Sequence, residues 1–345
     1  MRELLAKRGI ITLIMADRMH PKISVITPSF NQGKFLKETI DSVISQQYPD
    51  LEYIIIDGGS TDQSIDIIKS YASNLTYWIS EKDNGQSQAL NKGLRRATGE
   101  IVTWLNSDDT YEPGTLLKIA EHFLSRPDIS LLHGKTILFG EGRKDELRGA
   151  PSKDVDALYL AYIPFPQPSS FFRRHVLIEQ GFLDESLHYG MDFDLLARIA
   201  LNYKIDRSEE IYSRYRMHPQ SKSNYELGFI HDWNIVFSRI LRSLPGTEKK
   251  IEAMKMLGLY KPGDVTYQVR EGFNASLIEL SFYYFLKSQA QLYYIAGDTK
   301  NSAMLFDYIR KKNPGFYKRE KLSGLHFRAS LLNPYLLKVI RAIKA

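Results

Sequence analysis

The 345-residue sequence predicts an α/β protein with a mostly parallel central sheet and a helical appendage at its C-terminal end. Between residue 22 and about residue 138, short apolar segments alternate with segments of helical periodicity. This alternation predicts right-handed strand–helix–strand crossovers and a parallel sheet with helices on both faces. After about residue 224 the periodicity is mostly helical.

The expected strands are rich in Ile, Val, Tyr and Trp, which favour extended backbone. They comprise residues 23–28, 51–57, 75–80, 100–106 and 130–139. The expected helices comprise residues 34–47, 62–73, 86–97 and 113–125. Ligands of such sheets bind beyond the carboxyl ends of the strands. Polar clusters follow three of the strands, at 28–31, 57–62 and 106–109, so we expect the binding site along that edge.

The stretch from 140 to 222 is less regular. Residues 141–154 are typical of a polar loop, and three prolines between 162 and 174 exclude a helix there. Further helices are expected at 173–180 and 190–202.

We expect three parts in the chain: an N-terminal extension over 1–21, an α/β domain over 22–223 and a helical region over 224–345. This length suffices for one large domain and a smaller unit. The sequence has no cysteine, which excludes disulfides, thiolate metal sites and a cysteine nucleophile. The apolar run at 9–16 is shorter than the roughly 20 residues that cross a bilayer, so we expect no membrane-spanning helix.

The net charge of +6 comes from the C-terminal end of the chain. Residues 308–345 hold ten basic residues and one acid, which leaves a net charge of −3 on residues 1–307. A basic tail indicates an anionic surface as partner rather than a basic active site. From Asn333 onward, apolar and basic residues fall on different sides of a helix, as in helices that lie on anionic lipid. A terminal helix packed on its own domain gives the same pattern, so both interpretations stay open for 331–345.

Two adjacent carboxylates, Asp108 and Asp109, follow the strand expected at 100–106. Carboxylate and amide oxygens suit Mg²⁺ or Mn²⁺, which commonly joins protein carboxylates to substrate phosphates. Asn106 adds an amide oxygen just upstream. The alternative is a turn that caps the helix expected at 113–125.

Asp57 ends a continuous apolar strand and precedes Gly58 and Gly59, which permit a tight turn and close approach of the backbone to a ligand. We therefore interpret Asp57 as a binding residue, whereas Asp62 is better explained as the cap of the next helix. Asp83 lies in another polar turn, before a helix whose cations either meet phosphate or line a solvated face.

Asp192 and Asp194 lie near the start of the helix expected at 190–202, where acids favour the helix dipole and capping is the default interpretation. His218 lies beside Pro219, and a lone histidine in such a turn is usually a hydrogen-bonded surface residue. The sequence has neither a G-x-G-x-x-G nor a Walker lysine motif, which argues against dinucleotide binding and P-loop chemistry.

Taken in order, these clusters resemble the family 2 glycosyltransferases with the GT-A fold, of the bacterial cell-surface polysaccharide type. The resemblance covers about residues 22–223. The motifs that carry it are ISVITPSFNQGKFLKETIDSVISQQYPDLEYIIIDGGSTDQS, WLNSDD, QPSSFFRR, GMDFDLLAR and RMHPQSKS. It implies transfer of a sugar from a nucleotide diphosphate donor to an acceptor hydroxyl, usually with inversion at the anomeric carbon.

The resemblance also implies a nucleotide site. The loop after the first strand matches the segment that binds the base, and the aspartate after the second strand matches one that contacts the nucleobase or ribose. The residues assigned to the nucleotide are Thr27, Pro28, Phe30, Asp57, Asp83 and Ser107.

Residues 106–108 match the D-x-D motif of the family, which implies that Asp108 holds Mn²⁺ or Mg²⁺ at the diphosphate. Asp109 lies beside it, and His218 matches a histidine near the diphosphate that is sometimes a metal ligand. Asn106 replaces the first aspartate of the motif, which removes one negative charge.

Asp192 matches the catalytic base of the family. The residue before it is usually a glutamate and is Met191 in this sequence. Asp194 is a rival for the same role, and we expect Asp192 to be the base. The base would take the proton of the acceptor hydroxyl as its oxygen attacks.

We therefore expect a metal-dependent, inverting hexosyltransferase that uses a nucleotide-diphosphate sugar, most often a UDP-sugar in this family. The expected acceptor is a saccharide or a lipid-linked saccharide. The expected location is cytoplasmic and peripheral at the inner face of the plasma membrane, without a nucleic-acid partner. One alternative is a nucleotidyltransferase, although the usual Gly-rich N-terminal loop with Arg and Lys is missing. The other is a non-catalytic nucleotide-sugar-binding or assembly protein, which Asn106 and Met191 favour.

Overall fold

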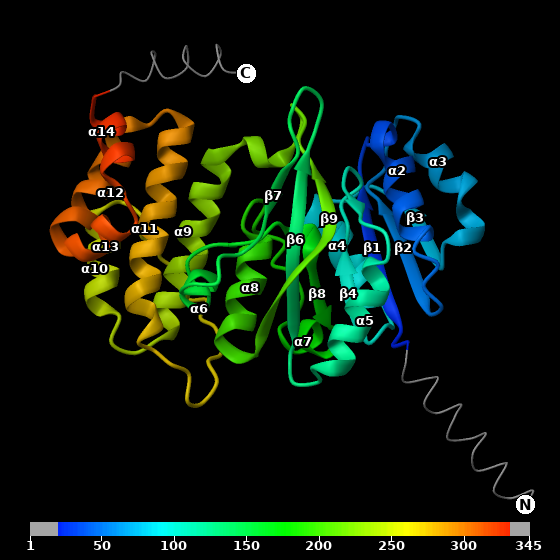
Figure 1. Cartoon of the computed structure of the whole chain (residues 1–345), viewed down its shortest axis with the longest axis horizontal. Coiled ribbons are helices and arrows are strands. Elements are labelled where there is room, and N and C mark those ends of the chain that lie inside the picture. The colour runs from blue at the N-terminus through cyan, green and yellow to red at the C-terminus, as the bar shows by residue number, and fades with distance from the viewer. Residues whose placement is uncertain (1–19, 332–345) are drawn as a thin grey trace, which may run out of the picture. The chain divides into compact units, whose positions relative to one another are not determined.

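The computed structural model of the chain describes residues 20–331, which form two compact units (Figure 1). The sheet unit contains the described residues up to Ala150, together with Phe165–Ser186 and Tyr203–His218. The helical unit contains Pro151–Pro164, Leu187–Asn202 and the described residues from Pro219 onward. These units are defined by packing, and the domain boundaries at 22 and 224 stay a prediction.

The sheet unit is built on one nine-stranded sheet with the order β3-β2-β1-β4-β8-β6-β9-β5, in which β7 pairs with β6. The strands are β1 (Ile23–Ser29), β2 (Leu51–Asp57), β3 (Tyr77–Ser80), β4 (Ile101–Trp104), β5 (Thr110–Tyr111), β6 (Leu131–Phe139), β7 (Glu146–Arg148), β8 (Ser170–Arg173) and β9 (Ile205–Arg216).

The first four strands confirm the predicted parallel crossovers. β1 pairs in parallel with β2 and β4, and β2 pairs in parallel with β3. β8 is antiparallel to both β4 and β6, while β6 and β9 are parallel to each other. β1–β4, β6 and β9 therefore share one direction, and the mostly parallel sheet is confirmed.

Four strands lie where the sequence predicted none, and the two-residue strand β5 is one of them. β7 lies in the expected polar loop, and β8 follows the prolines of the irregular segment. β9 reads IDRSEEIYSRYR and is mostly half-buried, with two exposed glutamates, Glu209 and Glu210. Such a strand is stabilised by its long pairing with β6 rather than by an apolar pattern.

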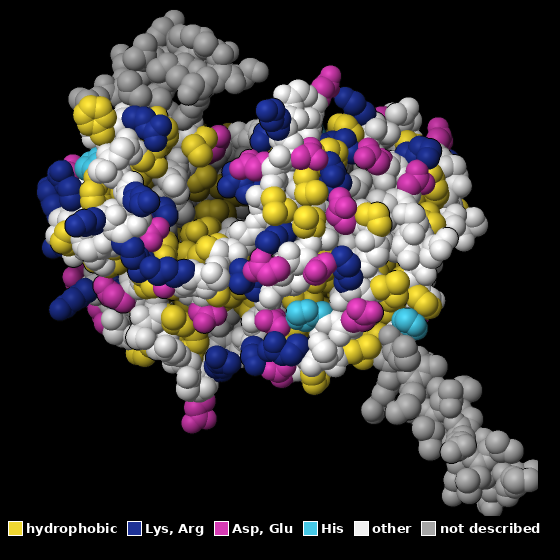
Figure 2. All heavy atoms as spheres, in the orientation of Figure 1, with side chains coloured by type: hydrophobic (Ala, Val, Ile, Leu, Met, Phe, Trp, Pro, Cys, Tyr) yellow, Lys and Arg dark blue, Asp and Glu magenta, His cyan; other side chains and the backbone are white. Residues whose placement is uncertain are grey.

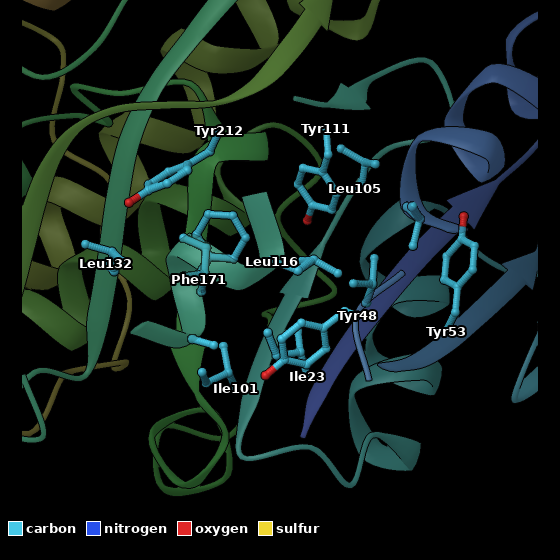
Figure 3. Packing of buried hydrophobic residues seen from close by; sticks show 14 of the residues in the cluster. Ile23, Tyr48, Tyr53, Ile101, Leu105, Tyr111, Leu116, Leu132, Phe171 and Tyr212 are labelled. Atoms are coloured by element: carbon cyan, nitrogen blue, oxygen red, sulfur yellow. The ribbon is translucent and has the colours of Figure 1, made fainter. Parts of the chain in front are cut away.

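Helices cover both faces of the sheet. They are α2 (Gly33–Ile44), α3 (Ser64–Ser70), α4 (Gln86–Arg96), α5 (Thr115–Ser125) and α7 (Arg174–Glu179), with the short turns η1 (Ala72–Asn74) and η2 (Gln167–Ser169). Residues of α2, α3 and α5 form one core with Ile23, Tyr53 and Phe171 of the strands (Figure 3). α4 packs on the other face, where a Cβ on Gly93 would lie 2.5 Å from Ile26 Cγ2.

The helical unit contains the appendage predicted after residue 224. Its elements are α6 (Val155–Tyr159), α8 (Met191–Asn202), η3 (Lys222–Asn224), α9 (Glu226–Ser243), α10 (Glu248–Met256), α11 (Leu277–Ala296), α12 (Thr299–Lys312), α13 (Pro314–Arg319) and α14 (Ser323–Leu331). Gly297 ends α11 with a left-handed backbone (φ 87°), a conformation that glycine adopts without steric cost. The terminal helix predicted from Asn333 lies outside the described residues. Within 20–331, no helix combines the length and the apolar character that a membrane crossing requires.

Asp194 attaches α8 to the rest of the helical unit. Its side chain is 2% exposed, and its carboxylate lies 2.7 Å from Arg198 Nη2 and 3.0 Å from Arg239 Nη1. The hydroxyl of Tyr267 donates to the same carboxylate at 2.5 Å. Both oxygens of Asp194 are therefore occupied by partners from α8, α9 and the segment before α11.

Asp194→Ala should destabilise the protein strongly, because it leaves the guanidinium groups of Arg198 and Arg239 buried without their counter-charge. We expect a loss of about 3–5 kcal/mol in the free energy of unfolding, measured in urea. The matched control is Asp307→Ala, which removes an exposed partner of Arg310 on α12 and should cost less than about 1 kcal/mol. Equal losses in the two variants would contradict the anchoring role.

Candidate functional site

Asp109 follows β4 and points into the interior of the sheet unit. Its side chain is 0% exposed, and its Oδ1 accepts the backbone N–H of Arg216 at 2.9 Å. Asn106 Nδ2 lies 3.4 Å from Oδ2. Burial, followed by the charge of Asp108, raises the pKa of Asp109 well above its ordinary value. Asp109 thus ties the turn after β4 to the end of β9, and it caps no helix.

Asp108 points the other way and pairs with a histidine. Its Oδ2 lies 3.0 Å from His218 Nε2, and its carbonyl oxygen accepts from Arg216 Nε at 2.9 Å. The Asp108 side chain is 20% exposed. Phe35 of α2 packs against the imidazole of His218 with ring centroids 4.8 Å apart. The structure thus brings together two residues to which the sequence assigned the metal.

Amide side chains surround Asn106. Gln86, the first residue of α4, donates from Nε2 to Asn106 Oδ1 at 2.8 Å. Gln167 of η2 lies 3.5 Å from Asn106 Nδ2 and donates to the carbonyl of Trp104 at 3.0 Å. Sequence reasoning missed both glutamines and Arg216, because single amide or basic residues in turns give no pattern of their own.

The donor set can be tested against Mn²⁺ or Mg²⁺. Within residues 20–331, no group of three or more His, Asp or Glu side chains could hold a metal ion. Asp108 offers one carboxylate and His218 offers one imidazole, and Asp108 Oδ2 lies 3.0 Å from His218 Nε2. The carboxylate is partly exposed to solvent. Such a pair fits an ion that takes its remaining ligands from substrate phosphates and water. The carboxylate of Asp109 faces the interior and would not contact the ion. Asp109 would support the metal site only by fixing the turn that carries Asp108.

The end of β1 supplies one unsatisfied hydroxyl, and the residue that follows it supplies one exposed ring. The Thr27 hydroxyl is buried 3.1 Å from that of Tyr53, so its side chain belongs to the core, and Pro28 is buried beside it. The Ser29 hydroxyl is buried and has no hydrogen-bond partner in the described part of the chain. Phe30 is 58% exposed, which leaves its ring available to a ligand.

Asp57 and Asp83 lie at the same edge. Asp57 is fully buried, and its carboxylate accepts from the N–H groups of Gly59 and Ser60 and from the hydroxyls of Ser60 and Ser80, at 2.6–3.1 Å. It therefore fixes the loop after β2. Asp83 accepts from the N–H of Gly85 at 2.8 Å, and its Oδ2 would lie 2.7 Å from a Cβ placed on Gly58. A glycine is thus required where the Asp83 carboxylate approaches the backbone. Ser107 is buried.

Asp192 belongs to the helical unit, in the first turn of α8. Its Oδ1 accepts the N–H of Phe193 at 2.9 Å, and its side chain is half-buried. Burial raises the pKa of Asp192, the charge of Asp232 adds to this increase, and the charge of Lys222 opposes it. A carboxylate with a raised pKa and partial exposure suits a proton acceptor. Asp194, the rival candidate, forms ion pairs with Arg198 and Arg239.

The sequence resembles known glycosyltransferases over most of the sheet unit. The model of glycosyl transferase family 2 matches residues 24–180. An uncharacterized glycosyltransferase of Mycobacterium tuberculosis (strain CDC 1551 / Oshkosh) is 31% identical over 186 residues, which are 52% of this chain and 70% of that protein. The chain belongs to glycosyltransferase family 2. The family resemblance predicted from the five motifs is therefore confirmed.

Two solved structures share the fold of this family 2 chain. The mannosyltransferase PcManGT from Pyrobaculum calidifontis, in complex with GDP-Man and Mn²⁺, has a TM-score of 0.56 at 17% identity and covers 92% of this chain and 82% of its own. S. aureus TarS 1-349 in complex with UDP-GlcNAc has a TM-score of 0.55 at 19% identity and covers 84% of this chain and 92% of its own. The GT-A fold predicted from the sequence is confirmed.

Proposed function

We propose that this family 2 glycosyltransferase moves a hexose from a nucleotide-diphosphate sugar, a UDP-sugar in the first instance, to a saccharide or lipid-linked saccharide. The acceptor would be a precursor of a cell-surface polysaccharide or glycolipid. The proposal rests chiefly on the pairing of Asp108 with His218 after β4, at the sheet edge where ligands of such folds bind. The GDP-Man and UDP-GlcNAc complexes of PcManGT and TarS support the donor class.

The nucleotide would lie along the loops after β1 and β2. Phe30 offers an exposed ring for the base, and the unsatisfied hydroxyl of Ser29 offers a polar contact beside it. The carboxylate of Asp57 holds the loop after β2 in place, which leaves the Asp83 carboxylate over Gly58. These residues would position the donor, and fixed positioning supplies part of the rate acceleration.

Asp108 and His218 would hold Mn²⁺ or Mg²⁺ at the diphosphate. A cation there offsets the negative charge that the leaving diphosphate gains. Asp192 would accept the proton of the acceptor hydroxyl while its oxygen forms the new bond to the anomeric carbon. The bond from that carbon to the diphosphate oxygen breaks, and its electron pair leaves with the diphosphate. A single in-line displacement of this kind inverts the anomeric centre.

A non-catalytic nucleotide-sugar-binding protein is the second candidate, because Asn106 and Met191 depart from the family pattern. It shares the donor site with the first candidate and differs in having no turnover. Asn106 is neutral and already hydrogen-bonded to Gln86, so the charge for a metal comes from Asp108.

Donor binding should depend on the metal and on Asp108. In thermal-shift assays with UDP-, GDP-, dTDP- and CMP-sugars, we expect one nucleotide class to stabilise the protein in the presence of Mn²⁺ or Mg²⁺. At 100 times the dissociation constant the gain is about 2.7 kcal/mol. Asp108→Ala should abolish it, whereas Asp109→Asn should keep it, because an amide oxygen can still accept from Arg216.

No shift with any donor in the folded wild type would contradict the donor site. Loss of the shift in Asp109→Asn as well would show that Asp109 is itself a ligand. A metal-dependent shift without transfer or hydrolysis of the sugar would favour the non-catalytic candidate.

The rate should fall at acidic pH through protonation of Asp192. Because its pKa is raised, the rate should decrease at a higher pH than for an ordinary aspartate, whose pKa is about 3.9. Asp192→Asn should lower kcat by about 10²–10⁴-fold with donor binding unchanged. The control is Asp156→Asn, an exposed acid in the first turn of α6. An unchanged kcat in Asp192→Asn would assign the proton transfer to another group.

We also propose a peripheral position at the cytoplasmic face of the plasma membrane. Lys and Arg side chains gather over α12 and α13 (Figure 2). Lys311, Lys312 and Lys318 are exposed there, and Phe327 of α14 is 65% exposed. The basic segment 331–345, assigned to the membrane from the sequence, lies beyond the described residues apart from the last residue of α14.

Vesicle sedimentation tests the membrane proposal. The protein should sediment with vesicles of phosphatidylcholine and phosphatidylglycerol, not with phosphatidylcholine alone, and salt should weaken binding. Each lysine near the surface contributes about 1 kcal/mol, so Lys311→Glu with Lys312→Glu should weaken binding at least tenfold. The control, Lys69→Glu with Lys144→Glu, makes the same charge change at exposed sites of the sheet unit. Equal effects of the two double variants would contradict the assigned surface.

A further inference from the structure

A row of aromatic side chains lies along the start of α9 in the helical unit. Phe229 and Trp233 lie four residues apart on one face of α9, and Tyr225, the residue before the helix, lies four positions before Phe229. Tyr189, from the segment before α8, packs between the first two, with centroid distances of 5.3 Å to each. Phe229 and Trp233 are 5.9 Å apart. These four residues are called the aromatic row below.

The row becomes more exposed toward the start of α9. Phe237, one further interval along the helix, is fully buried and stacks on Phe285 at 4.0 Å. Phe229 and Trp233 are half-buried, and Tyr225 is 52% exposed. The open end of the row therefore leaves aromatic ring surface accessible to a ligand.

The aromatic row and Asp192 share one rigid support. Asp232 of α9 accepts the backbone N–H groups of Tyr189 at 2.7 Å and Gly190 at 3.1 Å, two residues before Asp192. A Cβ on Gly228 would lie 2.4 Å from Tyr189 Cδ2, so the ring of Tyr189 lies directly on the helix backbone. The Asp232 carboxylate therefore fixes the backbone at Tyr189 and Gly190, just before α8, and Gly228 leaves room for the ring of Tyr189.

The row also contains an unsatisfied donor. The indole Nε1 of Trp233 is buried and has no hydrogen-bond partner within residues 20–331. Leaving such a donor unpaired costs free energy, and buried groups of this kind usually meet water or a ligand.

We infer that the aromatic row is the acceptor subsite and that it binds a pyranose ring of a saccharide. One face of a pyranose presents C–H groups of partial positive charge, which pack on the negative faces of aromatic rings. Hydroxyls at the rim of the sugar then reach polar groups, and one of them is presented to Asp192. A lipid chain would also fit the rings but has no hydroxyl to offer there. The inference rests on the proposed role of Asp192.

Saturation-transfer-difference NMR tests the subsite without any donor or metal. The probes are the methyl α- and β-pyranosides of glucose, galactose, mannose and N-acetylglucosamine. We expect at least one probe to receive saturation, strongest on the C–H protons of one face. Tyr225→Ala should weaken its binding about three- to tenfold, as expected for one lost ring contact.

Two variants control this experiment. Tyr225→Phe keeps the ring and should bind like the wild type, and it also reports whether position 225 tolerates change. Phe327→Ala removes another exposed ring, on α14, and should leave binding unchanged. The inference is overturned if no pyranoside receives saturation from the wild type, or if Tyr225→Ala binds as well as the wild type.

Failure of the inference is distinguishable from failure of the proposed function. A protein that shows the metal-dependent donor shift but binds no pyranoside keeps the proposed function and loses the subsite. A protein that binds a pyranoside through Tyr225 but no nucleotide sugar keeps a saccharide site and loses the proposed function.

Discussion

The hydrogen bond from the Arg216 N–H to the Asp109 carboxylate joins two segments 107 positions apart, and the candidate metal site depends on it. It fixes the end of β9 against the turn after β4, so that His218, two residues beyond Arg216, comes to lie 3.0 Å from Asp108. The Arg216 guanidinium adds a second contact, to the carbonyl of Asp108. A buried carboxylate is costly unless it is hydrogen-bonded, so this turn has few alternative conformations.

Buried carboxylates have a similar role in the helical unit. Asp194 binds two arginines and so holds α8 to α9, while Asp232 holds the residues just before α8. Asp192 lies between these two anchors and keeps a partly exposed side chain. Because neighbouring carboxylates anchor the backbone, the orientation of Asp192 is fixed while its own carboxylate does not serve as an anchor. Precise positioning of a proton acceptor requires this arrangement.

The two units differ in how the sequence encodes them. β1, β2 and β4 of the sheet unit are buried on both faces. Their continuous apolar runs could therefore be recognised in the sequence, and their parallel pairing was predicted correctly. β9 is charged and half-buried, and its pairing with β6 depends on the register of a strand 74–77 residues earlier. Local periodicity carries no information about such a partner.

The sequence alone determined the family, the GT-A fold and the sheet edge at which the candidate residues lie, because motifs and periodicity are local properties of the chain. Only the tertiary structure separated the members of each acidic pair. Asp108 and Asp109 are adjacent, yet one faces a histidine and the other faces the core, since successive side chains of a turn point in different directions. Asp192 and Asp194 differ in the same way, because Arg239 of α9 and Tyr267, both distant in sequence, join Arg198 on the carboxylate of Asp194. Partners brought together by folding, not residue types, thus decide which carboxylates stay available for chemistry.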